Sequence, residues 1–196
     1  MNKRNPEDFF FEKIKLSVSR KLEALSPHLT YHNLAHTLDV TQQCERLAND
    51  EGITDAHALY LLKVAALYHD TGFLKVYKNH EEEGCAIFLE DAVEYAFSES
   101  DKTFVQRIII ATKLPQHPQD IYERIICDAD LDYLGRPDFY TTGDKLRKEF
   151  LHYGFVKSDE EWKKRQIEFL QTHHYHTNSS KHLREPVKQQ HLAELL

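Results

Sequence analysis

Apolar residues recur along this chain mainly three and four positions apart, and strict alternation of apolar and polar residues is nearly absent. That period is typical of helices with one buried face and argues against a sheet. The six glycines and six prolines separate the periodic stretches. The sequence therefore predicts an all-α fold, with helices over 6–25, 33–49, 54–68, 81–97, 102–113, 118–128, 138–153, 159–173 and 179–195.

Local signals mark several of these helix ends. Asn33 is a suitable N-cap for the second helix, and Gly52 follows the end of that helix. Ser158 followed by Glu161 is the pattern of a capping box. The stretch LLKVAALY at 61–68 is apolar on nearly every side, which indicates that the third helix lies in the centre of the core.

Length and composition narrow the class of protein. A chain of 196 residues favours one domain, so we expect residues 1–196 to share one core. The net charge of −7 argues against a dedicated surface for nucleic acid or anionic membranes. No apolar run approaches the roughly 20 residues that span a bilayer. Cys44, Cys85 and Cys127 lie in apolar helical segments, which favours buried thiols in a reducing cytoplasm over disulfides.

Two histidines and two carboxylates stand out in three separate segments. They are His36 in YHNLAHT, His69 and Asp70 in AALYHDTG, and Asp130 in ICDADLDYLGR. A charged pair at the end of an apolar run is costly unless something binds it. The TG that follows His69 and Asp70 ends their helix, so that both side chains can point into one pocket. The four residues could then form one site.

Each of these residues is ambiguous alone. A single histidine on an apolar face is usually a hydrogen-bonded core residue, and DAD is usually an acidic turn. Together the four predict one divalent-metal site. Imidazole with carboxylate suits Mn, Fe, Co, Ni or Zn, whereas Mg prefers oxygen ligands alone. A hydrated ion in such a site would be suited to hydrolysing phosphate esters.

The order H…HD…D, with YHNLAHT at its start and DADLDYLG at its end, resembles the HD-domain superfamily of metal-dependent phosphohydrolases. Within it, the chain resembles the small bacterial proteins usually called predicted HD-superfamily metal-dependent phosphohydrolases. The resemblance covers about residues 28–175 and implies a multi-helix HD bundle. It implies His36, His69, Asp70 and Asp130 as the metal ligands. Asp128 would then lie beside the ligands or face solvent.

Two departures from that family bear on the chemistry. HD proteins with two metals usually have further histidines after the doublet. His80 is present, but Thr112 and Lys113 stand where the next histidine is expected, so we expect one ion. A nucleotidase branch places a glutamate shortly after the doublet, where this chain reads TGFLKVY. Asp70, Glu81 or His80 would have to handle the proton instead.

Four residues are candidates for contact with a substrate. His80 could protonate a leaving oxygen, bind a weak second ion, or simply begin a helix. Lys113 could assist catalysis by holding a phosphate, or it could complement a helix C-terminus. Arg136 could hold a phosphate with two parallel donors, or it could be a surface residue. His32 could close the pocket, orient His36, or be a turn residue.

These features predict hydrolysis of a phosphate ester, on a nucleotide or another small phosphorylated metabolite, with one divalent ion activating the water. Asp70 would orient or deprotonate that water, with assistance from His80, Lys113 and Arg136. One alternative is a metal-dependent nucleotide-binding or sensory module without turnover, and another is a structural helical protein with incidental histidines. The sequence names neither the substrate nor the metal. It leaves the oligomeric state open, a homodimer included.

Overall fold

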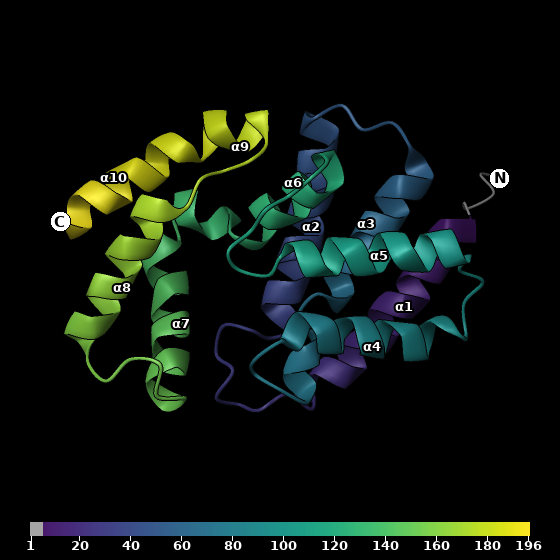
Figure 1. The fold of residues 1–196 in the computed structure, drawn as a ribbon, viewed down its shortest axis with the longest axis horizontal. Helices are drawn as coiled ribbons and strands as arrows, with labels where there is room; N and C mark the ends of the chain where they lie inside the picture. Colours follow the sequence, from purple (N-terminus) through teal and green to yellow (C-terminus); the bar gives the residue numbers. More distant parts are fainter. Residues whose placement is uncertain (1–5) are drawn as a thin grey trace.

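The computed structural model describes residues 6–196, and within that range every regular element is a helix (Figure 1). This confirms the all-α prediction. Residues 1–5 of the expected domain lie outside the described range. The elements are α1 (Pro6–Leu22), α2 (Leu34–Asp50), α3 (Ala56–Tyr68), η1 (Thr71–Leu74), α4 (His80–Ala92), α5 (Glu99–Ala111), α6 (Ile121–Asp130), η2 (Asp132–Gly135), α7 (Phe139–His152), α8 (Asp159–Thr172), α9 (Asn178–Leu183) and α10 (Glu185–Leu195).

Helix α3 forms the centre of the larger core. Every residue from Leu61 to Tyr68 except Lys63 is buried, as the LLKVAALY pattern predicts. The helix packs against α1, α2 and α5. Since burying one large apolar side chain stabilises a fold by about 1.5–3 kcal/mol, this packing holds α3 firmly in place. The residues that follow Tyr68 therefore enter the interior at a defined position.

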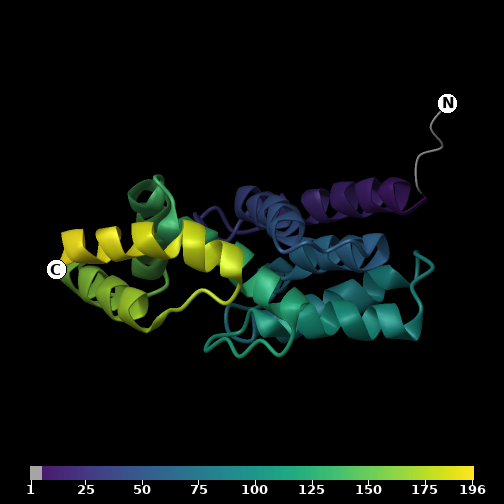
Figure 2. The ribbon, with the colours of Figure 1, turned by 90° about the horizontal axis from the view of Figure 1, so that it is seen from above.

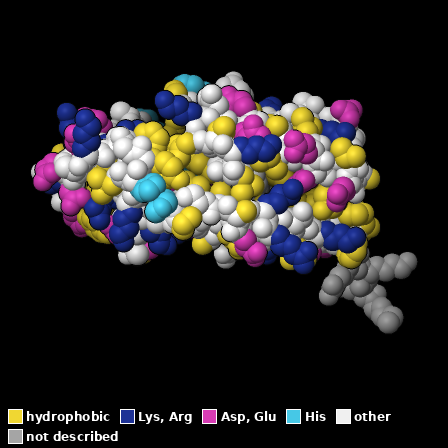
Figure 3. Space-filling model, turned by 90° about the horizontal axis from the view of Figure 1, so that it is seen from below, with side chains coloured by type: hydrophobic (Ala, Val, Ile, Leu, Met, Phe, Trp, Pro, Cys, Tyr) yellow, Lys and Arg dark blue, Asp and Glu magenta, His cyan; other side chains and the backbone are white. Residues whose placement is uncertain are grey.

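The four C-terminal helices form the other end of the molecule. Figures 1 and 2 show α7–α10 gathered at one end of an elongated shape, with α1–α6 at the other. Between these two parts, the face in Figure 3 has a gathering of hydrophobic side chains. A second apolar cluster holds α7, α8 and α10 against η2. Its buried members are Tyr31, Leu131, Tyr133, Leu134, Phe139, Leu170 and Tyr175.

Asp132 in η2 joins the two parts by charge. Its side chain is only 1% exposed. The carboxylate accepts hydrogen bonds from Arg46 of α2 at 2.9 Å and from Arg184, between α9 and α10, at 2.8 and 3.1 Å. At Gly135 a Cβ would lie 2.4 Å from the carbonyl oxygen of Arg184. This close approach lets the C-terminal helices reach the buried carboxylate.

Several predicted helix bounds are wrong: the helices predicted over 6–25, 81–97 and 118–128 are α1 (Pro6–Leu22), α4 (His80–Ala92) and α6 (Ile121–Asp130). Two further differences have a clear local reason. Helix α5 begins at Glu99 rather than 102, because Ser98 and Asp101 form a capping box in which each side chain accepts the other's backbone N–H. The helix predicted over 179–195 is two helices, α9 and α10, which meet at Arg184. Pro186 lies in the first turn of α10, where a missing backbone N–H costs no hydrogen bond.

Other predicted signals are confirmed. Asn33 caps α2, and Gly52 follows that helix with a φ of 74°. Ser158 caps α8 by accepting from the N–H of Glu161. A capping box also requires the Glu161 carboxylate to accept from the N–H of Ser158. That part of the prediction is wrong, because the carboxylate accepts from the N–H of Lys157 at 2.7 Å.

The structure also bears on the cysteines and on membrane insertion. Cys44, Cys85 and Cys127 are buried free thiols, as predicted. Burial raises the pKa of each, so none is poised to react as a thiolate. Within residues 6–196, no helix combines the length and apolar character that crossing a bilayer requires.

Replacing Asp132 with Ala should destabilise the protein strongly. Arg46 and Arg184 would lose their buried counter-charge, and the free energy of unfolding should fall by about 3 kcal/mol. Urea denaturation followed by circular dichroism measures this change. Asp138→Ala is the matched control, because Asp138 pairs with Arg136 at the surface and should change stability by no more than about 1 kcal/mol. Equal losses for the two variants would contradict the linking role of Asp132.

Candidate metal centre

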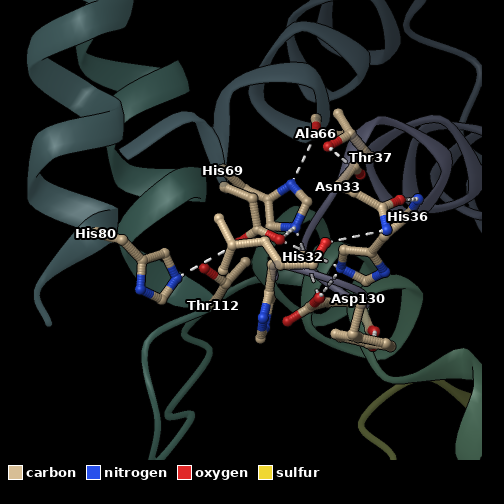
Figure 4. Close-up of polar contacts among 12 residues, drawn as sticks. His32, Asn33, His36, Thr37, Ala66, His69, His80, Thr112 and Asp130 are labelled. Carbon is tan, nitrogen blue, oxygen red and sulfur yellow. Dashed lines mark hydrogen bonds and ion pairs between the residues drawn. The ribbon is translucent and has the colours of Figure 1, made fainter. Parts of the chain in front are cut away.

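Three helices bring the predicted metal ligands together (Figure 4). His36 lies in the first turn of α2, close to the N-cap Asn33. His69 and Asp70 directly follow the last residue of α3, and Asp130 is the last residue of α6. Helix α2 packs against both α3 and α6. The ends of the three helices therefore meet, although the residues lie far apart in the sequence.

The ligand atoms are close enough to share one ion. His36 Nε2 lies 3.1 Å from Asp130 Oδ1 and 3.4 Å from Asp70 Oδ2. His69 Nε2 lies 3.2 Å from Asp70 Oδ2 and 3.6 Å from Asp130 Oδ1. Ligands about 2.1 Å from an ion at the centre of a tetrahedron lie about 3.4 Å from one another. The observed separations therefore fit a single divalent cation.

The hydrogen bonding of His69 points to the same conclusion. Its Nδ1–H donates to the carbonyl oxygen of Ala66 at 2.8 Å, so the lone pair of the neutral ring is on Nε2. His69 Nε2 and Asp70 Oδ2 are buried, and neither has a hydrogen-bond partner. Two such atoms left without partners cost roughly 1–3 kcal/mol each. A cation between them would satisfy both, and the bond to Ala66 is the kind that orients a metal-binding histidine.

In the absence of an ion, the histidines and carboxylates of the site pair with one another, and this pairing shifts their pKa values. Burial lowers the pKa of His69, but Asp70 and Asp130 outweigh it and raise that pKa well above its usual value. Burial raises the pKa of Asp70, but His69 and His80 outweigh it and hold that pKa well below the usual range. The pKa of Asp130 is lowered in the same way by His36 and His69 against its burial. The carboxylates therefore remain ionised, as cation ligands must be, and His69 would release its second proton when its neutral ring binds a cation.

A cavity of about 460 Å³ opens beside these ligands. Asp70 and Asp130 reach its wall, while the side chain of His69 behind them is 1% exposed. His32, His80 and Lys113, three of the residues predicted to contact a substrate, also line it. Its volume is in the range of small-molecule sites. The arrangement thus places metal ligands on the wall of a space that a small ligand can enter.

Phe73 of η1 holds two of the histidines in place. Its ring stacks against that of His32 and against that of His80, with centroid distances of 4.4 and 4.0 Å. His80 Nδ1 lies 3.3 Å from the carbonyl oxygen of Tyr77, and its Nε2 lies 3.4 Å from Asp70 Oδ1. His80 is therefore directed toward the metal ligands, although it also begins α4.

Glu149 of α7 is a site residue that no motif indicates. Its buried carboxylate accepts from the N–H groups of Tyr31 and His32 at 3.1 and 3.2 Å and from the Tyr77 hydroxyl at 2.7 Å. It also lies 2.5 Å from His32 Nδ1. Burial lowers the pKa of His32, but the hydrogen bond to Glu149 outweighs it and raises that pKa. Glu149 thus fixes His32 from a position 117 residues away.

Two of the predicted substrate contacts are engaged elsewhere. Lys113 lines the cavity, but its ammonium pairs with Glu82 and donates to Asn79 at 3.3 Å. Arg136 does not line the cavity, and its guanidinium is held by Asp39 at 2.8 and 3.0 Å and by Asp138 at 2.8 and 2.9 Å. The position of Arg136 does not support a direct contact with substrate in this cavity.

Two cations that are not among the predicted substrate contacts do line the cavity. Lys78 precedes α4, and Arg165 belongs to α8. Neither has a carboxylate partner within the described residues, and the Arg165 guanidinium lies 5.1 Å from the centre of the Phe150 ring. Unlike the charges of Lys113 and Arg136, their charges are therefore not paired with a carboxylate of residues 6–196.

Asp128 has a structural role instead of lying beside the ligands or facing solvent. Its fully buried carboxylate accepts from the N–H groups of His176 and Thr177, both at 2.8 Å, and from the Thr177 hydroxyl at 2.6 Å. Thr177 is the N-cap of α9. Asp128 therefore ties the start of α9 to α6, and the expectation for this residue is corrected.

A comparison with protein-family models gives a match to the HD domain over residues 33–132. The chain belongs to the HD-domain family. HD domains bind divalent metals and suggest a metal-dependent hydrolase, and all four predicted ligands lie inside the matched range. Helices α7–α10 lie beyond its end. The comparisons found no matching curated protein and no matching solved structure.

Metal-free protein should bind one divalent ion per chain, with Mn²⁺, Co²⁺ and Zn²⁺ as the probes in calorimetric titration. His69→Ala removes the buried Nε2, and the metal affinity should fall by at least about 100-fold, more than the loss of a supporting residue causes. His174→Ala is the control, because His174 is exposed and lies outside the cluster. Equal affinity of His69→Ala and the unsubstituted protein would exclude His69 as a ligand.

Proposed function

We propose that the protein is a metal-dependent phosphohydrolase that acts on a nucleotide or another small phosphate ester. The observation that carries this proposal is the pair of buried, unpartnered atoms, His69 Nε2 and Asp70 Oδ2, beside a cavity that Asp70 and Asp130 line. A divalent ion held by His36, His69, Asp70 and Asp130 would supply a Lewis acid and lower the pKa of water enough for attack at neutral pH.

Asp70 links the metal ligands to the proton chemistry. Its Oδ2 faces His36 and His69, and its Oδ1 faces His80 Nε2 at 3.4 Å. In the proposed reaction a water oxygen attacks phosphorus and the bond from phosphorus to the leaving oxygen breaks. Asp70 takes the proton of the water, and protonated His80 gives its proton to the leaving oxygen. Transfer of the proton from Asp70 to His80 then restores both groups.

The remaining phosphate charge would be met by the cations on the wall. Lys78 and Arg165 have no carboxylate to release, whereas Lys113 would have to exchange Glu82 for the phosphate. His32, held by Glu149, lines the same space and offers a further donor. Such preplaced donors stabilise charge that develops in a transition state. Lys78 is therefore assigned to the phosphate ahead of Arg136, whereas Arg165 lies over the ring of Phe150 in the apolar part of the cavity.

One ion is the stoichiometry that the described residues support best. The Thr112 side chain, where a further histidine would serve a second ion, donates to the carbonyl oxygen of Ile109 at 2.8 Å. One ligand atom each from His36, His69 and Asp130 lies within 4.8 Å of the other two, which suits one ion. His80 is thus left for proton transfer.

A second candidate function is metal-dependent nucleotide binding without turnover. It is favoured by the segment after the doublet, because residues 71–78 contain no carboxylate that could serve as a separate general base. The only acidic side chains on the cavity wall are Asp70, Glu81 and Asp130. Asp70 would then have to combine metal binding with proton transfer, which a binding module does not require.

His80→Gln should lower kcat for phosphate-ester hydrolysis by about 100-fold, because Gln cannot donate a proton to the leaving oxygen. The assay uses protein loaded with Mn²⁺ or Co²⁺ and a panel of nucleotides and generic phosphoesters. His174→Ala is again the control and should retain activity. Metal stoichiometry should remain one per chain in both variants, which separates catalysis from metal binding.

Two results would contradict the proposal. Unchanged kcat in His80→Gln would remove His80 from proton transfer. If the loaded protein hydrolyses no member of the panel but retains a nucleotide that is recovered intact, the binding module is the correct function.

A further inference from the structure

The cavity extends well beyond the metal ligands. From Asp70 and Asp130 it continues between η2, α7 and α8 into a lobe whose wall is mainly apolar. We call this the apolar lobe, lined by Leu146, Phe150, Phe155, Trp162, Phe169 and Leu170. The face in Figure 3 shows hydrophobic side chains gathered between the two ends of the molecule. All six residues lie outside the HD-domain match, which ends at 132.

A continuous series of rings connects the two ends of the cavity. Phe73, which stacks on His80, lies 5.0 Å from Tyr77 between ring centres. Tyr77 lies 4.7 Å from Phe155. The last two steps, from Phe155 to Phe150 and from Phe150 to Trp162, are 5.4 and 5.7 Å. These are the distances of direct aromatic contact. The apolar wall therefore begins beside the proton-transfer residue and runs without interruption to Trp162.

The lobe is apolar but incompletely covered by the chain itself. Phe150, Phe155, Trp162 and Phe169 are all only partly buried. Removing apolar surface of this kind from water is favourable by about 25 cal/mol of free energy per Å². The polar groups of the lobe are Arg165 and Gln166 of α8, and no carboxylate lines it. Its chemistry thus suits an uncharged ring and does not suit a cation.

We propose that the apolar lobe binds the organic part of the phosphate ester, and that this part is an apolar aromatic group of one or two rings. The inference rests on the proposed function, because it places the phosphate at the metal ligands. Helices α7 and α8 would then determine specificity, while the HD core supplies the chemistry. A small polyol would leave the rings of the lobe exposed to water, whereas a flat ring would stack on them.

The test uses non-hydrolysable probes that differ only in the organic part. Benzylphosphonate and methylphosphonate are titrated into the Mn²⁺-loaded protein by calorimetry. Benzylphosphonate should bind about tenfold more tightly, the effect of about 1.4 kcal/mol from one aromatic contact. Trp162 is the single tryptophan of the chain, so its fluorescence should change with benzylphosphonate and report occupancy of the lobe directly.

Trp162→Ala should reduce the preference for benzylphosphonate to within about twofold, with metal stoichiometry unchanged. Trp162→Phe keeps a ring and should retain most of the preference. Phe9→Ala is the matched control, because Phe9 is an exposed aromatic residue of α1 far from the lobe in sequence and absent from its wall. The comparison of the two probes on unsubstituted protein needs no variant to fold.

The outcomes separate this inference from the proposed function. Equal affinities for the two probes, in a protein that hydrolyses phosphate esters, would overturn the lobe assignment and leave the proposed function standing. A benzyl preference that Trp162→Ala abolishes, without turnover of any ester, would support the lobe and contradict hydrolysis. A preference unaffected by Trp162→Ala would place the ring elsewhere, and failure of both probes to bind would contradict both proposals.

Discussion

The site depends on two buried polar atoms, His69 Nε2 and Asp70 Oδ2, that form no hydrogen bond within residues 6–196. Central helix α3 is held by apolar packing on nearly every side, and it ends by placing His69 and Asp70 in the interior. The bond from His69 to the carbonyl oxygen of Ala66 commits the ring to one orientation, with the free nitrogen toward Asp70. The cost of leaving these atoms unpaired is what a cation would remove.

Two parts of the chain contribute different residues to the site and its cavity. The HD core, from α2 to α6, positions the candidate metal ligands, and α7 and α8 close one side of the cavity beyond the matched range. Asp132 and Glu149 connect the parts: Asp132 by its buried pairs with arginines, and Glu149 by its hold on His32. The position of His32 relative to the metal ligands therefore depends on how the C-terminal helices dock.

The fold and the four candidate metal ligands could be predicted from the sequence, because those signals are local or recurrent. Helical periodicity, the cap at Asn33 and the order of the HD residues need only neighbouring positions or a familiar motif. Glu149 and the commitments of Arg136 could not be predicted, because they depend on contacts such as that with Asp39, 97 residues distant. Likewise, Lys113 pairs with Glu82 through tertiary packing, whereas Lys78 has no carboxylate partner among residues 6–196. Neither outcome can be predicted from neighbouring positions in the sequence.

The central claim is that one cation belongs between the two imidazoles and the two carboxylates. Anomalous X-ray diffraction from crystals soaked in Mn²⁺ tests it most directly. We expect one strong anomalous peak, about 2.0–2.3 Å from His36 Nε2, His69 Nε2 and the carboxylate oxygens of Asp70 and Asp130. A fully soaked crystal with no peak there, or with its strongest peak at other residues, would contradict the account.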